Sequence, residues 1–169
     1  MIIVCPLNKL EKIVDDHNPS HVVSLLGAQS DMPDLRERSD AEHLKLSFND
    51  ISNPREDLVL PGANHIDALL QFVAAWEQQR PMVIHCFAGV SRSTAAAYIA
   101  QCALNDTLDE LELARHLRAA SPSATPNKRM VELADLTLKR DGKMSAAIAS
   151  IGRGADAWEG NVFNLAVSI

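Results

Sequence analysis

One short segment constrains the fold of this chain more than any other, because a strand, a loop and a helix follow one another in it without a break. Pro81 to Ile84 is apolar and short enough for a buried strand, and the alanine-rich run from Thr94 to Ala100 favours a helix. The loop between them has the sequence His85-Cys86-Phe87-Ala88-Gly89-Val90-Ser91-Arg92-Ser93. Unpaired backbone N–H groups at the start of a helix attract anions. The segment therefore predicts an anion-binding loop that contains a cysteine.

The spacing within this loop suits a phosphoryl group. Five residues separate Cys86 from Arg92, enough for backbone N–H groups to surround one anion. The planar guanidinium of Arg92 can bind two oxygens at once, and Gly89 permits backbone geometry that a side chain would block. We expect Cys86 to ionise beside these dipoles and Arg92 and to act as a nucleophile. The expected phosphate-binding residues are Phe87, Ala88, Gly89, Val90, Ser91 and Arg92.

These residues resemble the C-x5-R-[S/T] signature loop of cysteine-dependent protein tyrosine phosphatases, and the pattern H-C-x-x-G-x-S-R-S is most similar to the compact dual-specificity branch. The resemblance implies that Cys86 forms a phosphocysteine and that Arg92 binds the phosphoryl oxygens. It also implies that the hydroxyl of Ser93 helps the sulfur to leave in the second step. His85 would brace the loop; the alternative is a histidine that merely ends the strand. The resemblance implies neither a metal nor another cofactor.

The family also uses an aspartate on a separate upstream loop as general acid. Leu44 to Phe48 alternates apolar and polar residues, which is typical of a half-buried strand, and Asp50 follows its end. Asp57 lies deeper in the same charged, proline-containing loop and is the rival candidate. We favour Asp50, because a strand end positions a carboxylate better than the middle of a loop. The Trp-Pro-Asp signature of the large receptor-type phosphatases is absent.

A second supporting residue is suggested by the pair Pro126-Asn127. In the dual-specificity branch an asparagine in this context braces the signature loop from below. Asn127 could equally be the N-cap of the helix that follows it, since asparagine is a favoured capping residue. Both interpretations remain open from the sequence. Further back, Thr107-Leu108-Asp109-Glu110 matches a capping box with Thr107 as the N-cap.

The fold class follows from the order of the expected elements. Strands alternate with helices up to the loop, and several helices follow it, which predicts an α/β fold with a mainly parallel central sheet, helices on both faces and a helical C-terminal half. A helix is expected over residues 61–79 from its apolar periodicity. We expect one phosphatase-like domain over residues 1–151, and a tail over residues 152–169 that shows no clear period.

The composition limits which classes of binding partner we expect. The net charge of −6 argues against extended nucleic-acid binding. No long apolar run or basic start is visible, so we expect no membrane partner. The three cysteines, Cys5, Cys86 and Cys102, form no disulfide or metal pattern, and free thiols suit a reducing compartment such as the cytoplasm. Cys5 and Cys102 are expected to be core residues. The oligomeric state is not predicted.

The sequence therefore favours a protein tyrosine or dual-specificity phosphatase that hydrolyses phosphomonoesters, with a phosphorylated protein as the expected substrate. The loop contains no lysine, unlike many phosphoinositide phosphatases of the superfamily, and Ser91 stands where RNA-directed members usually have asparagine. One alternative is a phosphate-binding pseudophosphatase without turnover. Another is a phosphatase that acts on a non-protein substrate, a phosphoinositide or a nucleotide. Sulfur transfer and arsenate reduction also use cysteines in anion-binding loops.

Overall fold

The fold was analysed in a computed structural model, which describes residues 1–168. Its elements run in the order β1 (Ile2–Pro6), a 3-10 turn η1 (Leu7–Lys9), α1 (Leu10–His17), β2 (His21–Leu26), β3 (Glu42–Ser47), α2 (Ala63–Ala74), β4 (Met82–Cys86), α3 (Arg92–Leu104), α4 (Glu110–Ala120), α5 (Lys128–Thr137), α6 (Lys143–Ile151) and β5 (Phe163–Leu165).

The five strands form one sheet in the order β3-β2-β4-β1-β5. The four longer strands are parallel, and only β5 runs antiparallel, beside β1. β1, β2 and β4 are buried along their whole length, which explains their nearly continuous apolar sequences. β3 lies at the edge and is partly exposed, which explains its alternating pattern. The predicted α/β class with a mainly parallel sheet is confirmed.

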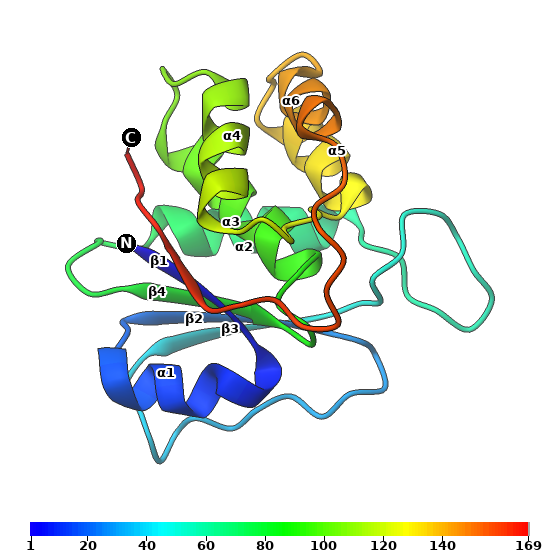
Figure 1. Ribbon diagram of the computed structural model, residues 1–169. Helices are drawn as coiled ribbons and strands as arrows, with labels where there is room; N and C mark the ends of the chain where they lie inside the picture. Colours follow the sequence, from blue (N-terminus) through cyan, green and yellow to red (C-terminus); the bar gives the residue numbers. More distant parts are fainter. Residues whose placement is uncertain (169) are drawn as a thin grey trace.

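Helices cover the two faces of the sheet unequally. In Figure 1, α1 lies alone below the sheet, whereas α2 and α3 lie directly above it and α4, α5 and α6 form a further layer. A small apolar cluster that includes Ile3, Cys5 and Val83 lies below the sheet. The large core lies above, around α3. The prediction of helices on both faces and a helical C-terminal half is therefore confirmed.

α3 is the helix that begins inside the loop, and it runs through the centre of the upper layers. Every residue from Arg92 to Cys102 is buried. Three consecutive alanines, Ala95 to Ala97, keep the helix narrow, so that the sheet and the surrounding helices approach it closely. A loop attached to such a helix cannot move without disturbing the core.

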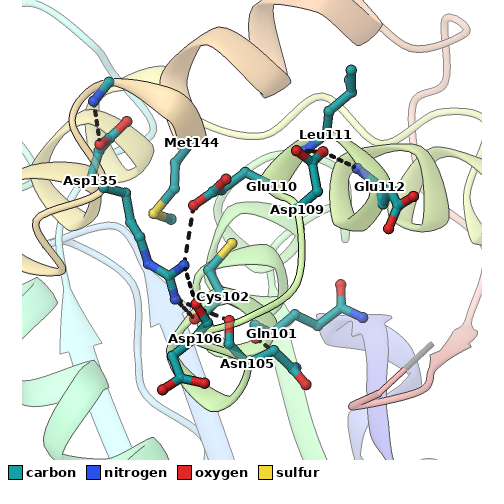
Figure 2. A network of polar contacts seen from close by, with 12 residues as sticks. Gln101, Cys102, Asn105, Asp106, Asp109, Glu110, Leu111, Glu112, Asp135 and Met144 are labelled. Carbon is teal, nitrogen blue, oxygen red and sulfur yellow. Dashed lines mark hydrogen bonds and ion pairs between the residues drawn. The ribbon is translucent and has the colours of Figure 1, made fainter.

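A polar network joins the far end of α3 to the outer helices (Figure 2). Arg140 donates to the carbonyl oxygens of Cys102, at 2.7 Å, and Asn105, at 3.0 Å, and pairs with the carboxylate of Glu110 at 3.1 Å. The buried carboxylate of Asp135 accepts from the backbone nitrogens of Gly142 and Ser145, both at 2.8 Å. These groups satisfy helix ends that would otherwise be buried without partners.

Two boundary predictions need correction. The helix expected over residues 61–79 is shorter, Ala63–Ala74, although Trp76 beyond its end is buried and its indole donates to Arg80 O at 2.9 Å. The N-cap of α4 is Asp109, not Thr107: its carboxylate accepts from the nitrogens of Leu111 and Glu112. An aspartate this close to a threonine offers an equally good cap, and packing of Glu110 with Arg140 favours the later start.

Within residues 1–168, no helix combines the length and the apolar character needed to cross a membrane.

Candidate active site

The loop lies between the end of β4 and the start of α3, at the carboxyl edge of the parallel strands. Cys86 is the last residue of β4, and Arg92 is the first residue of α3. Gly89 turns the loop with a φ of +71°. A Cβ there would lie 2.9 Å from the backbone nitrogen of Pro6, so both the conformation and the space require glycine.

The sulfur of Cys86 lies in a buried position and has two polar neighbours. The backbone nitrogen of Gly89 donates to Sγ at 3.3 Å, and Oγ of Ser93 lies 3.2 Å away. When Cys86 is a thiolate, the Ser93 hydroxyl is the donor of that second bond. A buried sulfur that faces two donors is a site for negative charge.

Arg92 is a buried cation with 7% exposure. Its Nη1 donates to the carbonyl oxygen of Phe48, at the end of β3, at 3.0 Å. Within residues 1–168 the guanidinium has no carboxylate partner, and its buried Nε has no protein acceptor. Because a buried charge is costly without a counter-charge, this arrangement fits an oxyanion held in front of the guanidinium.

Asp50 is hydrogen-bonded to the phosphate-binding loop and to Asn127. Its Oδ1 accepts from Ser91 Oγ at 2.8 Å and from Asn127 Nδ2 at 2.7 Å. Both donors bond the same oxygen, so Oδ2 is the atom that could carry a proton to a leaving group. The side chain of Asn127 also caps α5, because its Oδ1 accepts from the nitrogen of Met130 at 3.1 Å. The side chain of Asn127 is thus the N-cap of α5 and contacts Asp50, whereas the signature loop is reached by its backbone nitrogen, which donates to Ser91 O at 3.4 Å.

Asp57 lies elsewhere on the segment between β3 and α2. It is exposed and has a left-handed backbone, with a φ of +59°. This segment extends away from the body of the molecule in Figure 1. Asp50, by contrast, is hydrogen-bonded to Ser91 of the loop. The geometry brings Asp50 to the loop and does not bring Asp57 there.

His85 is part of a buried polar row across the sheet. Its Nε2 lies 2.6 Å from Ser24 Oγ on β2, and Ser24 Oγ lies 2.7 Å from Nε2 of His43 on β3. Burial lowers the pKa of His85 to about 4, and burial with the nearby Lys45 lowers the pKa of His43 to about 4. Both rings are therefore neutral at physiological pH. A hydroxyl has one proton, so Ser24 can donate to only one of the two rings, and at least one ring must donate to Ser24.

The other two cysteines are buried away from the reactive sulfur. Cys5 belongs to the apolar cluster below the sheet, whereas Cys86 belongs to the core above it. Burial raises the pKa of Cys5 to about 12 and that of Cys102 to about 12. Cys102 lies ten residues along α3 from Arg92, a separation of roughly 15 Å. All three cysteines are free thiols.

Three contributors to the site carry no signal in the sequence. The carbonyl of Phe48 anchors Arg92, and Ser24 and His43 extend the contacts of His85. Each depends on which strands are neighbours in the sheet. Residues 1–168 contain no group of three or more potential metal-ligating side chains.

Comparisons with known proteins agree with this geometry. The family described as "Protein-tyrosine phosphatase" matches residues 52–132, which include the whole loop. The crystal structure of DUSP15 has 18% sequence identity, a TM-score of 0.61 and coverage of 88% of this chain and 90% of its own. PTPMT1 in complex with PI(5)P has 14% identity, a TM-score of 0.63 and coverage of 89% and 94%.

The Yvh1 phosphatase domain from Chaetomium thermophilum has 14% identity, a TM-score of 0.58 and coverage of 85% and 93%. Comparison with curated protein sequences gives no match. The family match, the loop and the shared fold point the same way. Residues 52–132 match the family of protein-tyrosine phosphatases, and the fold supports the same superfamily of cysteine-dependent phosphoric monoester hydrolases in its dual-specificity-like form.

Proposed function

We propose that the chain hydrolyses phosphomonoesters on proteins through a phosphocysteine on Cys86. One observation carries the proposal: a buried guanidinium that has no carboxylate partner among residues 1–168 adjoins a loop whose cysteine sulfur already faces two hydrogen-bond donors. Such a site favours an oxyanion bound close to a nucleophile.

In the first half of the reaction, the thiolate of Cys86 attacks phosphorus and forms an S–P bond. The P–O bond to the substrate breaks as Asp50 gives its proton to the leaving oxygen. Arg92 and the loop N–H groups hold the remaining phosphoryl oxygens, which carry the charge of the transition state. The two bonds to Oδ1 of Asp50 aim its other oxygen at the leaving group.

In the second half, a water molecule gives a proton to the Asp50 carboxylate and attacks phosphorus. The S–P bond breaks, Cys86 regains its thiolate, and inorganic phosphate is released. The hydroxyl of Ser93, 3.2 Å from the sulfur, donates to the developing negative charge and makes the sulfur a better leaving group. Asp50 ends the cycle protonated, ready for the next substrate.

A phosphorylated protein is the substrate class that we favour. The loop provides one cation, Arg92, which suits a single phosphate better than a headgroup with several. Phe87 is 67% exposed next to Cys86 and offers an apolar contact for a peptide side chain. The three free thiols suit a reducing compartment, so we place the reaction in the cytoplasm.

A phosphoinositide is the second candidate, supported by the structural similarity to PTPMT1 in complex with PI(5)P. The two classes make different demands on charge around the loop. Release of phosphate from phosphopeptides and from phosphoinositides in mixed vesicles, compared at equal phosphate concentration, separates them. A higher kcat/KM for the vesicles would overturn the protein assignment.

The mechanism is tested by release of phosphate from an aryl phosphate in the presence of a chelator. Cys86→Ser and Arg92→Ala should lose nearly all turnover, whereas exposed Arg55→Ala should keep it. Asp50→Asn should lose roughly 10²-fold or more, and Asp57→Asn should resemble the wild type. Full turnover in Cys86→Ser would exclude the covalent route. Wild-type protein that binds tungstate without any hydrolysis would identify a pseudophosphatase.

A further inference from the structure

The segment between α6 and β5 passes directly behind the phosphate-binding loop. The nitrogen of Gly154 donates to Thr125 Oγ1 at 3.1 Å, and the nitrogen of Ala155 donates to Pro122 O at 2.9 Å. The nitrogen of Gly160 then donates to the carbonyl oxygen of Ala88 at 2.8 Å. Figure 1 shows this segment in orange and red, descending from α6 before it becomes β5 beside β1.

The bond from Gly160 acts on a peptide unit that also contacts the nucleophile. The carbonyl of Ala88 and the N–H of Gly89 belong to one planar group and point in opposite directions. Gly160 binds the carbonyl end, and the N–H end donates to Cys86 Sγ at 3.3 Å. Holding the oxygen outward therefore aims the N–H at the sulfur, and a carbonyl that accepts a bond makes the N–H of the same unit a stronger donor.

Other peptide units of the loop are held in the same way, by backbone nitrogens that follow β1 or precede α5. These bonds are Leu7 N to Phe87 O at 3.2 Å, Thr125 N to Val90 O at 2.9 Å, and Asn127 N to Ser91 O at 3.4 Å. The outer surface of the loop is thus fixed by carbonyl acceptors, which leaves its N–H groups to face inward. The C-terminal segment supplies the anchor for the unit nearest the sulfur.

The contact between the two segments is also sterically tight. A Cβ on Gly160 would lie 2.7 Å from the oxygen and 3.2 Å from the carbonyl carbon of Gly89. On its other side the loop touches β1, where a Cβ on Gly89 would meet the nitrogen of Pro6 at 2.9 Å. The loop backbone therefore lies between β1 and Gly160, and neither contact leaves room for a methyl group.

We propose that Gly160 is a positioning residue, and that through it the C-terminal segment sets the orientation of the Gly89 N–H toward the Cys86 sulfur and toward a bound phosphoryl oxygen. The inference deepens the proposed function, since it concerns the same loop. Residues 154–165 would then be part of the active-site framework.

The first test is Gly160→Ala, in which the added methyl group must push away the Gly89 carbonyl of the next peptide unit, so that Gly160 can no longer hold the Ala88 carbonyl at its present distance. Tungstate, an unreactive oxyanion, measures the loop directly by titration calorimetry, and we expect its dissociation constant to rise about tenfold or more. The rate of Cys86 alkylation by iodoacetamide at pH 6 should fall as well, because the sulfur loses the hydrogen bond from the Gly89 N–H. The control is Gly142→Ala, where the φ of +81° strains an added side chain but no atom lies within 4 Å of it. That variant should lose stability and keep both readouts.

The second test removes the hydrogen bond without adding bulk. An ester in place of the Glu159–Gly160 amide, introduced by ligation of a synthetic C-terminal peptide, deletes the N–H that bonds Ala88. It should weaken tungstate binding and slow alkylation in the same direction as Gly160→Ala. Unchanged tungstate binding and alkylation in the folded ester variant would overturn the proposal. Neither readout needs turnover, so a wild-type protein without phosphatase activity would refute the proposed function while these measurements still decide the role of Gly160.

Discussion

The side-chain amide of Asn127 donates to the carboxylate of Asp50 at 2.7 Å, across 77 positions of sequence. The same residue accepts from the nitrogen of Met130 at the start of α5 and donates its own backbone N–H to the loop carbonyl of Ser91. One asparagine thus connects the candidate general acid, the anion-binding loop and a helix end. Its position depends on the helical half of the chain, so the acid is held by a part of the fold distant from it in sequence.

This relationship predicts that Asn127→Ser separates catalysis from stability. Serine is as good an N-cap as asparagine, so the melting temperature should change little. The shorter side chain cannot reach Asp50, and the acid loses one of its two anchors. We expect turnover on a phosphate ester with a poor leaving group to fall roughly tenfold, part of the 10²–10⁴ that a positioned acid provides. An ester with a good leaving group should be affected much less.

The comparison for this variant is Asp109→Ala, which removes the cap of α4 and leaves the acid untouched. It should lower the unfolding free energy by about 1 kcal/mol, and the melting temperature with it, without changing the ratio of turnover rates on the two substrates. If Asn127→Ser also leaves that ratio unchanged, Asn127 does not position Asp50.

The polar network of Figure 2 predicts where the helical half is most sensitive. Arg140→Leu removes the ion pair with Glu110 and the bonds to the carbonyls at the end of α3, and it leaves a buried carboxylate without its partner. We expect a loss of about 3–5 kcal/mol in the free energy of unfolding, measured by urea denaturation. Glu110→Gln should cost less, because an amide can still accept from Arg140.

The exposed ion pair of Lys12 with Asp16 provides the contrast. Lys12→Leu should change the unfolding free energy by less than about 0.5 kcal/mol. If Arg140→Leu lowered the unfolding free energy no more than Lys12→Leu, the network would not contribute to the stability of the fold.

The central residues of the candidate site could be proposed from the sequence because they are close together in it. Cys86, Arg92 and Ser93 lie on one continuous strand, loop and helix, and a strand end is enough to locate Asp50. The fold class followed from the alternation of strands and helices. α3 begins at Arg92, close to where the alanine-rich run predicts a helix.

The surroundings were not predictable, since they depend on contacts between distant segments. Ser24 and His43 meet His85 only because β3, β2 and β4 are neighbours in the sheet. Gly160 lies in a segment without periodicity, and nothing in its local sequence indicates a bond to Ala88. The cap of α4 was misplaced because Thr107 and Asp109 are both good local candidates.

The row of His43, Ser24 and His85 predicts a dependence of stability on pH. The pKa of His85 is about 4 in the folded chain because of burial, against 6.5 for an ordinary histidine. Between these values the unfolded chain binds a proton that the folded chain does not, so the stability present above pH 6.5 is lost as the pH falls toward 4. His85 alone should account for up to about 3 kcal/mol of unfolding free energy. Urea denaturation at several pH values measures the slope.

His85→Gln should flatten that slope, whatever it does to stability at neutral pH. Exposed His17→Gln is the matched control and should keep the wild-type slope. Equal slopes in all three proteins would mean that His85 is not held neutral by burial.

The three cysteines should differ sharply in reactivity. In the native protein at pH 8, iodoacetamide should modify Cys86 alone, because Cys5 and Cys102 are fully buried and burial raises the pKa of each thiol to about 12. Mass spectrometry of the intact protein should show one addition under native conditions and three after unfolding in urea. Cys86→Ser should show none under native conditions.

The same arrangement predicts the outcome of oxidation by peroxide. Cys5 and Cys86 lie on neighbouring strands, but their side chains belong to clusters on opposite faces of the sheet. A disulfide needs its two Cβ atoms about 4 Å apart and directed toward each other, which this arrangement does not allow. Oxidation of Cys86 should therefore proceed to sulfenic and sulfinic acids without an internal disulfide. A Cys5–Cys86 crosslink in peptide mass spectra, formed under native conditions, would show that β1 or the loop rearranges before oxidation.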